Sequence, residues 1–370
     1  MINDIHIVGP MVLVGAFLLT YFIIPKIIWI VSSRNLIDQP DLRSSHEKPI
    51  PTMAGVSFFL TCIMLLFALK AWDTDIVGIN LVAGITVVFA VGLKDDLVLS
   101  SPRAKVMGEI MAISLVLYCS CIQVTSLQGF LGIHAINSVL SYALLGGAML
   151  LIINSYNLID GIDGLASMIG IVIFIAFAVI FFFTEMFFYF LLSLGFIGML
   201  AAYLRFNFSL SKKIFMGDTG SLIIGFCIAF LTVKFISADA LPFDAINFKV
   251  ENKIIVAFSV LCIPLFDTLR VIGIRLLNNK SPFYPDRNHI HHVLIDSKLP
   301  HYKVSLFLTL LNIAVIILFV SLSFYFNSYQ MVSFFALFFL SFLVVFSQLK
   351  KNIKVKNSFK RIIKFVNFIF

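Results

Sequence analysis

The sequence predicts an all-α integral membrane protein with a bundle of about eleven transmembrane helices. Hydrophobic residues make up 60% of the 370-residue chain and charged residues only 12%, about half the charged fraction of a typical soluble domain. The mean hydropathy is +1.04, and the apolar residues gather in runs long enough to cross a bilayer as helices. The predicted spans are residues 11–31, 53–71, 76–92, 106–124, 140–155, 165–183, 186–204, 221–236, 254–276, 304–326 and 330–348.

Lys and Arg are distributed unevenly between the loops, which predicts the orientation of the helices. The loops at 32–52, 93–105, 205–220 and 277–303 carry most of the cations, whereas the opposite set holds Lys70, Lys249 and Lys253. Because cytoplasmic loops are enriched in Lys and Arg, we expect the first set to be cytoplasmic. The odd number of spans then places the N-terminus outside and the C-terminus inside.

The last residues differ in composition from the rest of the chain. Residues 350–370 carry seven Lys or Arg with interleaved Ile, Val and Phe. Such a segment can lie as an amphipathic helix on an anionic leaflet, or it can be a basic tail that only enforces orientation. We therefore divide the chain into one transmembrane domain, residues 1–349, and a basic cytoplasmic tail, residues 350–370.

The most informative polar stretch is residues 154–166, which lies between two apolar runs on the predicted cytoplasmic side. It places Asn154, Asn157, Asp160 and Asp163 at intervals of three residues. On a helix each such step drifts by about 60°, so we expect the four side chains to spiral along one side near a helix end. Carboxylates and amides grouped at the edge of a membrane are more typical of a functional site than of a plain loop.

The first cytoplasmic loop, residues 38–55, contains three prolines that suppress helix formation. Lys48 stands beside Pro49 at the membrane edge, and we expect it to bind a phosphate. For Arg43 the sequence leaves two readings open, since a basic residue close to the membrane can equally contact anionic lipid.

The second cytoplasmic loop begins with two adjacent carboxylates, Asp95 and Asp96. Neighbouring carboxylates repel one another unless a cation lies between them, so they are a plausible site for Mg²⁺ and phosphate. Lys105 begins the next helix and can face back toward them. The alternative is a cluster at a helix end whose charges are satisfied by Lys94 and Arg103.

A further carboxylate, Asp218, lies in the sequence Gly-Asp-Thr-Gly-Ser at residues 217–221, directly before an apolar run. Asp218 could be a helix N-cap, which contributes about 1 kcal/mol. As a metal ligand it would instead hold Mg²⁺ against a diphosphate.

The longest polar loop contains three of the seven histidines, His289, His291 and His292, beside Arg287. This spacing is compatible with a zinc site. However, phosphate recognition also uses such donors, no cysteine lies nearby, and zinc would not explain the carboxylates in the other loops. We therefore favour contacts to a diphosphate or a sugar. On a helix, residues 289 and 292 would share a face and residue 291 would point elsewhere.

Together the five loops supply carboxylates, amides, lysine and histidine on one side of the membrane. These are the side chains that bind a magnesium-bound diphosphate. The competing class is an ion-coupled transporter. The carboxylates cluster at one interface rather than at the midplane, and no paired halves with broken helices are evident, which favours the enzyme. No nucleic-acid partner is expected.

These motifs resemble those of the polyprenyl-phosphate N-acetylhexosamine-1-phosphate transferases, glycosyltransferase family 4. The similarity runs from about residue 34 to residue 294 and is carried by residues 94–96, 154–166, 215–221 and 286–292. The His-x-His-His pattern resembles the branch that starts O-antigen, common-antigen or teichoic-acid linkage units, whereas consecutive histidines are typical of the peptidoglycan branch. The resemblance implies ten or eleven transmembrane helices with a site in a cytoplasmic groove.

The resemblance also implies an activity, a cofactor and partners. The protein would transfer a sugar 1-phosphate, with N-acetylglucosamine 1-phosphate favoured, from a UDP-N-acetylhexosamine to undecaprenyl phosphate in the bacterial plasma membrane, releasing UMP. The cofactor would be Mg²⁺, with Mn²⁺ as an alternative, and a homodimer is one candidate assembly. The runner-up within the family is the phospho-MurNAc-pentapeptide transferase of peptidoglycan synthesis.

Residue roles follow from the resemblance. Asp95 would position or deprotonate the lipid phosphate, while Asp96 and Asp160 would shape the catalytic site. Asp218 and Asp160 would hold the metal. Because the acceptor phosphate is already ionised near neutral pH, direct in-line attack is preferred over a covalent aspartyl intermediate. The expected substrate-binding residues are Lys48, Lys105, Asn154, Asn157, Asp163, Arg287, His289, His291 and His292.

Overall fold

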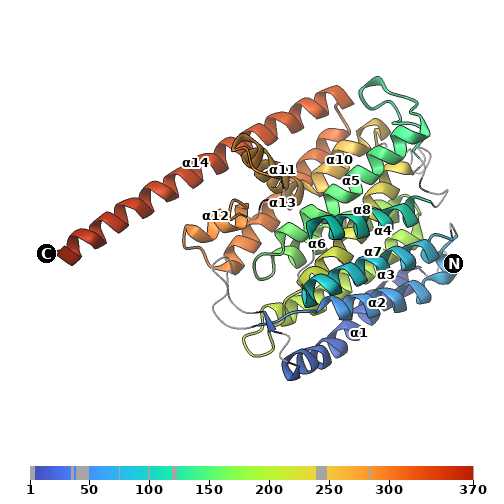
Figure 1. The fold of residues 1–370 in the computed structure, drawn as a ribbon. Helices are drawn as coiled ribbons and strands as arrows, with labels where there is room; N and C mark the ends of the chain where they lie inside the picture. Colours follow the sequence, from blue (N-terminus) through green and yellow to red (C-terminus); the bar gives the residue numbers. More distant parts are fainter. Residues whose placement is uncertain are drawn as a thin grey trace.

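The computed structural model describes residues 5–34, 37–38, 50–74, 76–98, 101–118, 122, 124–238, 248–282, 284 and 286–369, with side chains as far as residue 352. It is a bundle of helices (Figure 1). The helices are α1 (Ile5–Ser33), α2 (Gly55–Ala68), α3 (Gly78–Leu97), α4 (Pro102–Leu117), α5 (Ser138–Ile159), α6 (Leu165–Phe183), α7 (Phe187–Asn207), α8 (Gly217–Ser237), α10 (Lys253–Val260), α11 (Cys262–Leu277), α12 (Ile290–Asp296), α13 (His301–Ser323) and α14 (Ser328–Ile369). Two short strands, β1 (Ile37–Asp38) and β2 (Ile50–Pro51), pair antiparallel, and 3₁₀ turns lie at Lys70–Trp72, Phe130–Gly132 and Val250–Asn252.

The all-α membrane class is confirmed. Within the described residues, 8 helices are long and apolar enough to cross a membrane, or 9 if α10 and α11, which meet at 73°, form one broken span. Helices α2 and α4 have 14 and 16 residues and are shorter. A helix or helix pair thus occupies each of the predicted places, while the number of full crossings stays a prediction.

Helix α8 forms the centre of the bundle. Its side chains are almost all buried from Thr219 to Phe235, and it packs against α2, α3, α5, α6 and α10. Small residues allow this close approach: a Cβ on Gly84 of α3 would lie 2.4 Å from the ring of Phe226. Close backbone contact through small residues is how membrane helices pack without a hydrophobic driving force between them.

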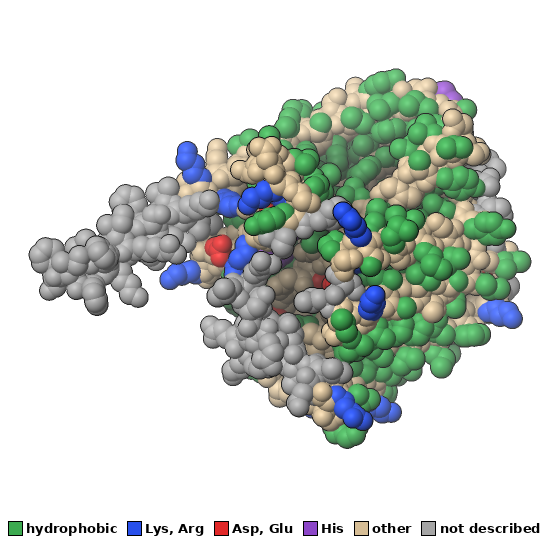
Figure 2. Space-filling model, viewed as in Figure 1, with side chains coloured by type: hydrophobic (Ala, Val, Ile, Leu, Met, Phe, Trp, Pro, Cys, Tyr) green, Lys and Arg blue, Asp and Glu red, His purple; other side chains and the backbone are tan. Residues whose placement is uncertain are grey.

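The loops that carry the polar motifs meet at one end of the bundle. The segment after β2 bonds to the segment before α8, with Ala54 N–H donated to the Phe215 carbonyl at 3.2 Å. In Figure 1, α1 begins at the opposite end of the bundle from the end where α14 leaves it, as an odd number of crossings requires. On the face shown in Figure 2, several Lys and Arg side chains surround a hollow in which acidic side chains are visible. Which end faces the cytoplasm stays a prediction.

Candidate active site

The beginning of α8 is held by a carboxylate from another helix. Asp96, near the end of α3, accepts the Asp218 N–H at 2.8 Å, the Thr219 N–H at 3.0 Å and the Thr219 hydroxyl at 2.5 Å. Gly217 has a φ of +71°, and a Cβ there would lie 2.6 Å from Asp96 Oδ2. Asp96 therefore caps α8, because unpaired N–H groups at a helix start need an acceptor. The alternative that Asp218 is itself the N-cap is wrong, and its carboxylate is turned to other partners.

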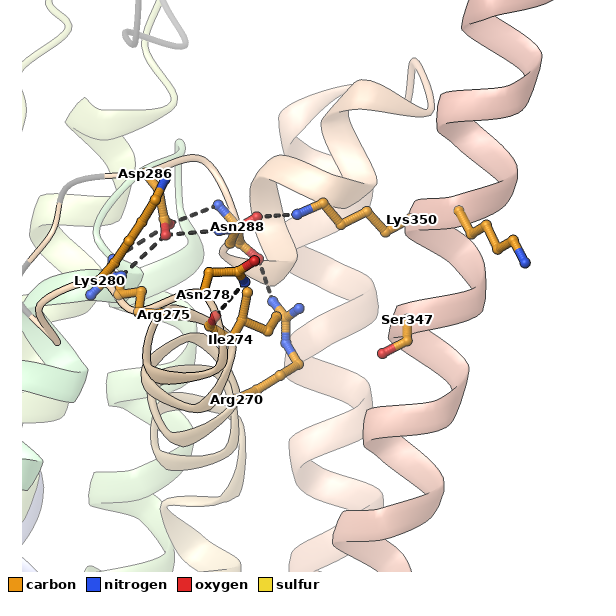
Figure 3. Close-up of a pocket in the computed structure, with 10 residues that line it drawn as sticks. Arg270, Ile274, Arg275, Asn278, Lys280, Asp286, Asn288, Ser347 and Lys350 are labelled. Atoms are coloured by element: carbon orange, nitrogen blue, oxygen red, sulfur yellow. Dashed lines mark hydrogen bonds and ion pairs between the residues drawn. The ribbon is translucent and has the colours of Figure 1, made fainter.

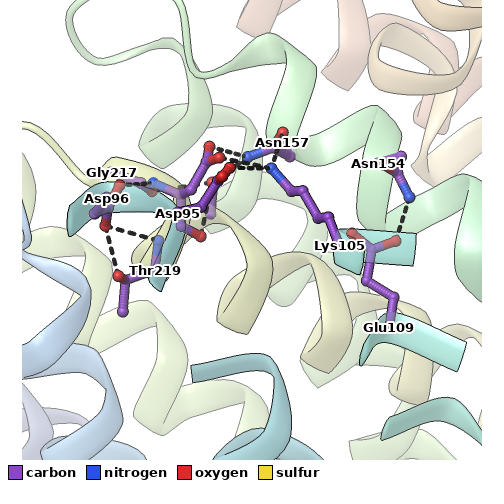
Figure 4. Close-up of polar contacts among 10 residues, drawn as sticks. Asp95, Asp96, Lys105, Glu109, Asn154, Asn157, Gly217 and Thr219 are labelled. Carbon is purple, nitrogen blue, oxygen red and sulfur yellow. Dashed lines mark hydrogen bonds and ion pairs between the residues drawn. The ribbon is translucent and has the colours of Figure 1, made fainter. Parts of the chain in front are cut away.

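Lys105 lies among the carboxylates, as Figure 4 shows. Its Nζ is 2.6 Å from Asp218 Oδ2 and 3.4 Å from Asp95 Oδ2, and it donates to Asn157 Oδ1 at 3.4 Å. The Asn157 amide in turn donates to Asp218 Oδ1 at 2.8 Å and to Ser221 at 2.7 Å. Helices α3, α4, α5 and α8 thus bring the predicted residues to one place. We call Asp95, Asp96, Asp160 and Asp218 the carboxylate cluster.

Asp160 joins this cluster at the end of α5. The residue is half-buried, and burial together with the charges of Asp218, Asp96 and Asp163 raises the pKa of its carboxyl to about 7. Like charges held close together disfavour the ionised form. The cluster therefore carries more negative charge than its surroundings offset.

The stretch 154–166 is only partly helical. Helix α5 ends at Ile159 and α6 begins at Leu165, with Gly164 at a φ of +78° between them. The expectation that all four polar residues spiral along one helical side is therefore wrong beyond Asn157, because a turn built on glycine redirects the chain. Asn154 donates to Glu109 Oε2 at 2.5 Å rather than facing the cluster.

Asp163 lies in this turn and joins other elements. Its Oδ2 is 2.6 Å from Lys213 Nζ and 3.2 Å from His301 Nδ1. Although burial opposes ionisation, the hydrogen bonds from His301 and Lys213 hold the pKa of Asp163 below its usual value. Asp163 thus ties the turn to α13 and to the segment before α8.

The histidine motif, residues 289–292, is supported by a buried network. His289 Nδ1 bonds to Asp267 Oδ2 at 2.9 Å, and Asp267 Oδ1 accepts the Ile290 N–H at 2.9 Å. Arg270 contacts the same Asp267 oxygen at 2.9 Å and also donates to the Asn288 carbonyl. Asp267 and Arg270 are 2% and 3% exposed, so this paired charge is enclosed by protein.

The arrangement of the histidines differs from the expected one. His289 precedes α12 instead of lying in it, and its ring stacks on that of His291, with centroids 5.8 Å apart and planes at 13°. The expectation that His291 points away from the others is therefore wrong. His291 lies against the turn after α5, since a Cβ on Gly161 would be 2.3 Å from its Nε2.

The imidazoles of α12 are neutral at pH 7. Burial, followed by the neighbouring charge of His292, lowers the pKa of His291 well below its usual value. Burial and the charge of Arg287 lower the pKa of His292 to about 4. Neutral imidazoles can donate or accept hydrogen bonds without adding charge.

One predicted residue, Arg287, lies away from this core. Arg287 is at the surface, 3.7 Å from Asp296, and both side chains are exposed. Lys48 and Arg43 lie outside the described residues. Sequence reasoning in turn missed Asp267, Glu109, Lys213 and His301. The first two had a usable signal, because a charged residue inside a predicted membrane span usually has a function or a partner.

The donor set fits Mg²⁺ better than a transition metal. In the described part of the chain, no three His, Cys, Asp or Glu side chains are grouped to hold a metal ion by themselves. Mg²⁺ is usually bound through one or two carboxylates and the phosphates of the substrate, rather than in an all-protein cage. Asp218 and Asp160 can supply those carboxylates.

Comparison with known proteins identifies the family of the chain. The model of glycosyl transferase family 4 matches residues 78–236. A probable undecaprenyl-phosphate N-acetylglucosaminyl 1-phosphate transferase of Bacillus subtilis is 30% identical over 290 residues, which are 77% of this chain and 76% of the relative. Undecaprenyl-phosphate alpha-N-acetylglucosaminyl 1-phosphate transferases of Escherichia coli K12 and Salmonella typhi are each 26% identical, over 74% and 80% of this chain and 73% and 79% of theirs. The chain therefore belongs to glycosyl transferase family 4 and is a multi-pass membrane transferase.

Proposed function

We propose that the protein transfers N-acetylglucosamine 1-phosphate from UDP-N-acetylglucosamine to undecaprenyl phosphate. An oxygen of the lipid phosphate attacks the β-phosphorus of the donor. The bond between that phosphorus and the oxygen bridging to the α-phosphorus breaks, and UMP leaves with the bridging oxygen. The observation that carries the proposal is the meeting of Lys105, Asn157 and the carboxylate cluster at one end of an apolar bundle, together with the activity named for the relatives.

The main obstacle to this reaction is electrostatic, because an anionic phosphate must approach an anionic diphosphate. The second pKa of a phosphate monoester is about 6, so the acceptor is largely ionised at pH 7 and needs little help from a general base. Lys105 offsets negative charge where the reactants meet. Asp95, 3.4 Å from Lys105 Nζ, orients that ammonium and can take a proton from an acceptor that arrives protonated.

Asp218, with Asp160, would hold Mg²⁺, or Mn²⁺ as the alternative. The ion, when bound, would neutralise charge on the diphosphate and make UMP a better leaving group. Asp96 fixes Asp218 through the start of α8, so its contribution to catalysis is the position of its neighbour.

The histidine motif would contact the diphosphate or the sugar. The bond from His289 Nδ1 to Asp267 fixes the ring and leaves Nε2 for the substrate. Asn154, Asn157 and Asp163 would bind the nucleotide side of the donor, and Arg287 and Lys48 would bind phosphate. We further propose that the protein lies in the bacterial plasma membrane and that its site faces the cytoplasm, where UDP-sugars are made. The protein would start an envelope polysaccharide such as O-antigen. A homodimer belongs to the same proposal, and the mass of the purified protein in detergent tests it.

The test is UMP release by purified protein given undecaprenyl phosphate and a panel of UDP-sugars. We expect turnover with UDP-N-acetylglucosamine, loss of turnover on chelation of Mg²⁺, and little effect of a zinc-selective chelator. Turnover with UDP-MurNAc-pentapeptide instead would place the protein in the peptidoglycan branch. Ion-driven flux in vesicles without UMP release would contradict the enzyme altogether.

A further inference from the structure

A second polar cavity lies beside the histidine motif, between α11, the loop that follows it and α14 (Figure 3). Its volume is about 490 Å³. Five of the side chains that line it are cationic and one is a carboxylate. They are Arg270, Arg275, Lys280, Lys350, Lys351 and Asp286. No member of the carboxylate cluster lines it, so it is distinct from the place where Lys105 meets Asp218.

The side chains that line this cavity carry more positive than negative charge. Arg275 pairs with Asp286 at 3.1 Å, and Arg270 pairs with Asp267 at 2.9 Å. Lys280 lies over the ring of Tyr284, 4.3 Å from its centroid. These charges favour an anion as the occupant of the cavity.

One wall of the cavity is formed by the buried Arg270. The residue is 3% exposed, and its guanidinium is held by Asp267 and by the Asn288 carbonyl. Its Nε has no hydrogen-bond partner among the described residues, but this atom is closed off from the cavity. An anion in the cavity would therefore act on Arg270 through the charge of the guanidinium, and a phosphate group supplies that charge together with acceptors for the lysines.

The cavity lies where the membrane-spanning part of α14 ends. The apolar stretch of α14 runs from Ser328 to Asn352, and only 11% of an 18-residue apolar window within it is buried inside the protein, so this window is largely open to lipid. Lys350 and Lys351 close that stretch, and the chain continues with five more Lys or Arg up to residue 364. Basic clusters just beyond a membrane helix, and basic pockets between helices, attract anionic lipid headgroups.

We propose that the headgroup of an acidic phospholipid binds in this cavity. Its phosphate would contact the lysines of α14 and the wall at Arg270, while its acyl chains run along the apolar face of α14. The occupant would also steady the histidine motif, because Asn288 accepts from Arg270 through its carbonyl and from Lys350 through its side chain. A soluble phosphate has the same chemistry but no reason to be enriched at this depth.

The experiment measures the melting temperature of the full chain in detergent with added phosphatidylglycerol or phosphatidylcholine, and counts retained phosphatidylglycerol by native mass spectrometry. We expect a rise of several degrees with phosphatidylglycerol and none with phosphatidylcholine. In a Lys350→Ala/Lys351→Ala variant most of the rise and of the retained lipid should disappear. Lys280→Ala, from the opposite wall, should reduce both by a smaller amount.

The matched control is Lys360→Ala/Arg361→Ala, which removes the same charge from a later part of the same helix, nine residues or more after Lys351. It should keep the lipid effect, and an equal loss in the control would overturn the proposal in favour of general attraction to the tail. Millimolar inorganic phosphate giving the same rise would assign the cavity to a soluble anion. UMP or UDP-N-acetylglucosamine giving a rise that Lys350→Ala/Lys351→Ala abolishes would assign it to the sugar donor. None of these readouts requires the proposed transferase reaction.

Discussion

The carboxylate cluster and the histidine motif meet at the turn after α5, where Asp160 belongs to the cluster and Gly161 lies against His291, and their charges are balanced in different ways. In the histidine motif, the buried Asp267 is neutralised within the same chain by Arg270 and by its bond to His289. In the carboxylate cluster, Lys105 contacts two carboxylates, while burial, together with the charges of Asp218, Asp96 and Asp163, raises the pKa of the Asp160 carboxyl to about 7.

This difference separates a structural network from a group of side chains that depends on a bound cation. A network whose charges are already paired can hold side chains in place without a ligand. A cluster with excess negative charge depends on a cation that arrives with the substrate. Substitution of Asp95 or Asp218 should therefore remove activity and leave the fold, whereas substitutions in the histidine network should affect both.

The largest effect is expected for Asp218→Asn. The change keeps the size of the side chain and the cap that Asp96 provides, but it removes the charge proposed to bind Mg²⁺. UMP release should fall by about a hundredfold to a thousandfold, the scale for losing one electrostatic contact to a transition state. The melting temperature in detergent should change little.

The control for this variant is Asp296→Asn, which removes an exposed carboxylate of α12 that pairs loosely with Arg287. It should retain activity. If Asp218→Asn kept most of its activity at ordinary magnesium concentrations, the proposal that the carboxylate cluster depends on a bound cation would be contradicted.

A smaller loss is expected for Asp267→Asn. The amide can still accept the Ile290 N–H, but it cannot neutralise Arg270 or hold His289 as firmly. Misplacement of a substrate-positioning group can lower activity on the order of a hundredfold, and an unpaired buried charge destabilises the fold by about 3–5 kcal/mol. The KM for the UDP-sugar should rise more than the KM for undecaprenyl phosphate.

Asp267→Glu, which restores the charge, should recover part of the affinity for the UDP-sugar. Equal changes in both KM values would mean that Asp267 supports the fold in general and does not position His289.

Gly161→Ala tests the contact between the turn that carries Asp160 of the carboxylate cluster and the histidine motif. The new Cβ would lie 2.3 Å from His291 Nε2, so the buried ring must move. Activity should fall on the order of tenfold, because the ring moves by less than an ångström or so.

Gly147→Ala in α5 is the matched control, since no atom lies within 4 Å of its new Cβ. It should stabilise the helix by about 0.5–1 kcal/mol and leave UMP release unchanged. Equal activity of the two variants would show that the carboxylate cluster and the histidine motif do not depend on each other.

The last effect concerns stability against pH. The pKa values of His291 and His292 are lowered in the folded protein, so below pH 6.5 the unfolded chain binds protons that the folded chain does not. The free energy of unfolding should therefore decrease as the pH falls from about 6.5 toward about 4, by at most about 1.4 kcal/mol per pH unit for each histidine. Denaturation in detergent across this range measures the slope, and His292→Gln should make it shallower. A slope unchanged by that substitution would locate the acid sensitivity elsewhere.

The fold was readable from the sequence because apolar runs of membrane length leave few alternatives. The helix ends were less predictable. Residues 106–124 were expected as a span, but α4 runs from Pro102 to Leu117, since Ser101 accepts the Ala104 N–H and Pro102 suits the first helical position. The tail was expected as a separate segment, yet α14 continues to Ile369, because the residues after 349 contain no proline or glycine to end a helix.

The site was readable only in part. Asp95, Asn157 and Asp218 stood out because polar groups at a membrane edge are rare, and the fold brings all three to Lys105. The hydrogen bond between Asp267 and His289 could not be predicted from the sequence, because it joins the middle of a span to a loop 22 residues later in the chain. Nor does a pair of adjacent aspartates reveal that one of them, Asp96, caps a helix from another part of the sequence.

The start of α8 also bears on how such an enzyme can change its donor during evolution. A Cβ on Gly55 would lie 2.2 Å from the Gly220 nitrogen, and one on Gly92 would lie 2.5 Å from the Thr219 Cα. Backbone from three helices meets there without room for a methyl group, so Asp218 cannot be moved by small steps. Selection for a different sugar should therefore leave α2, α3 and α8 untouched and accumulate changes in the segment around α12, whose short helix and loop can be rebuilt one residue at a time.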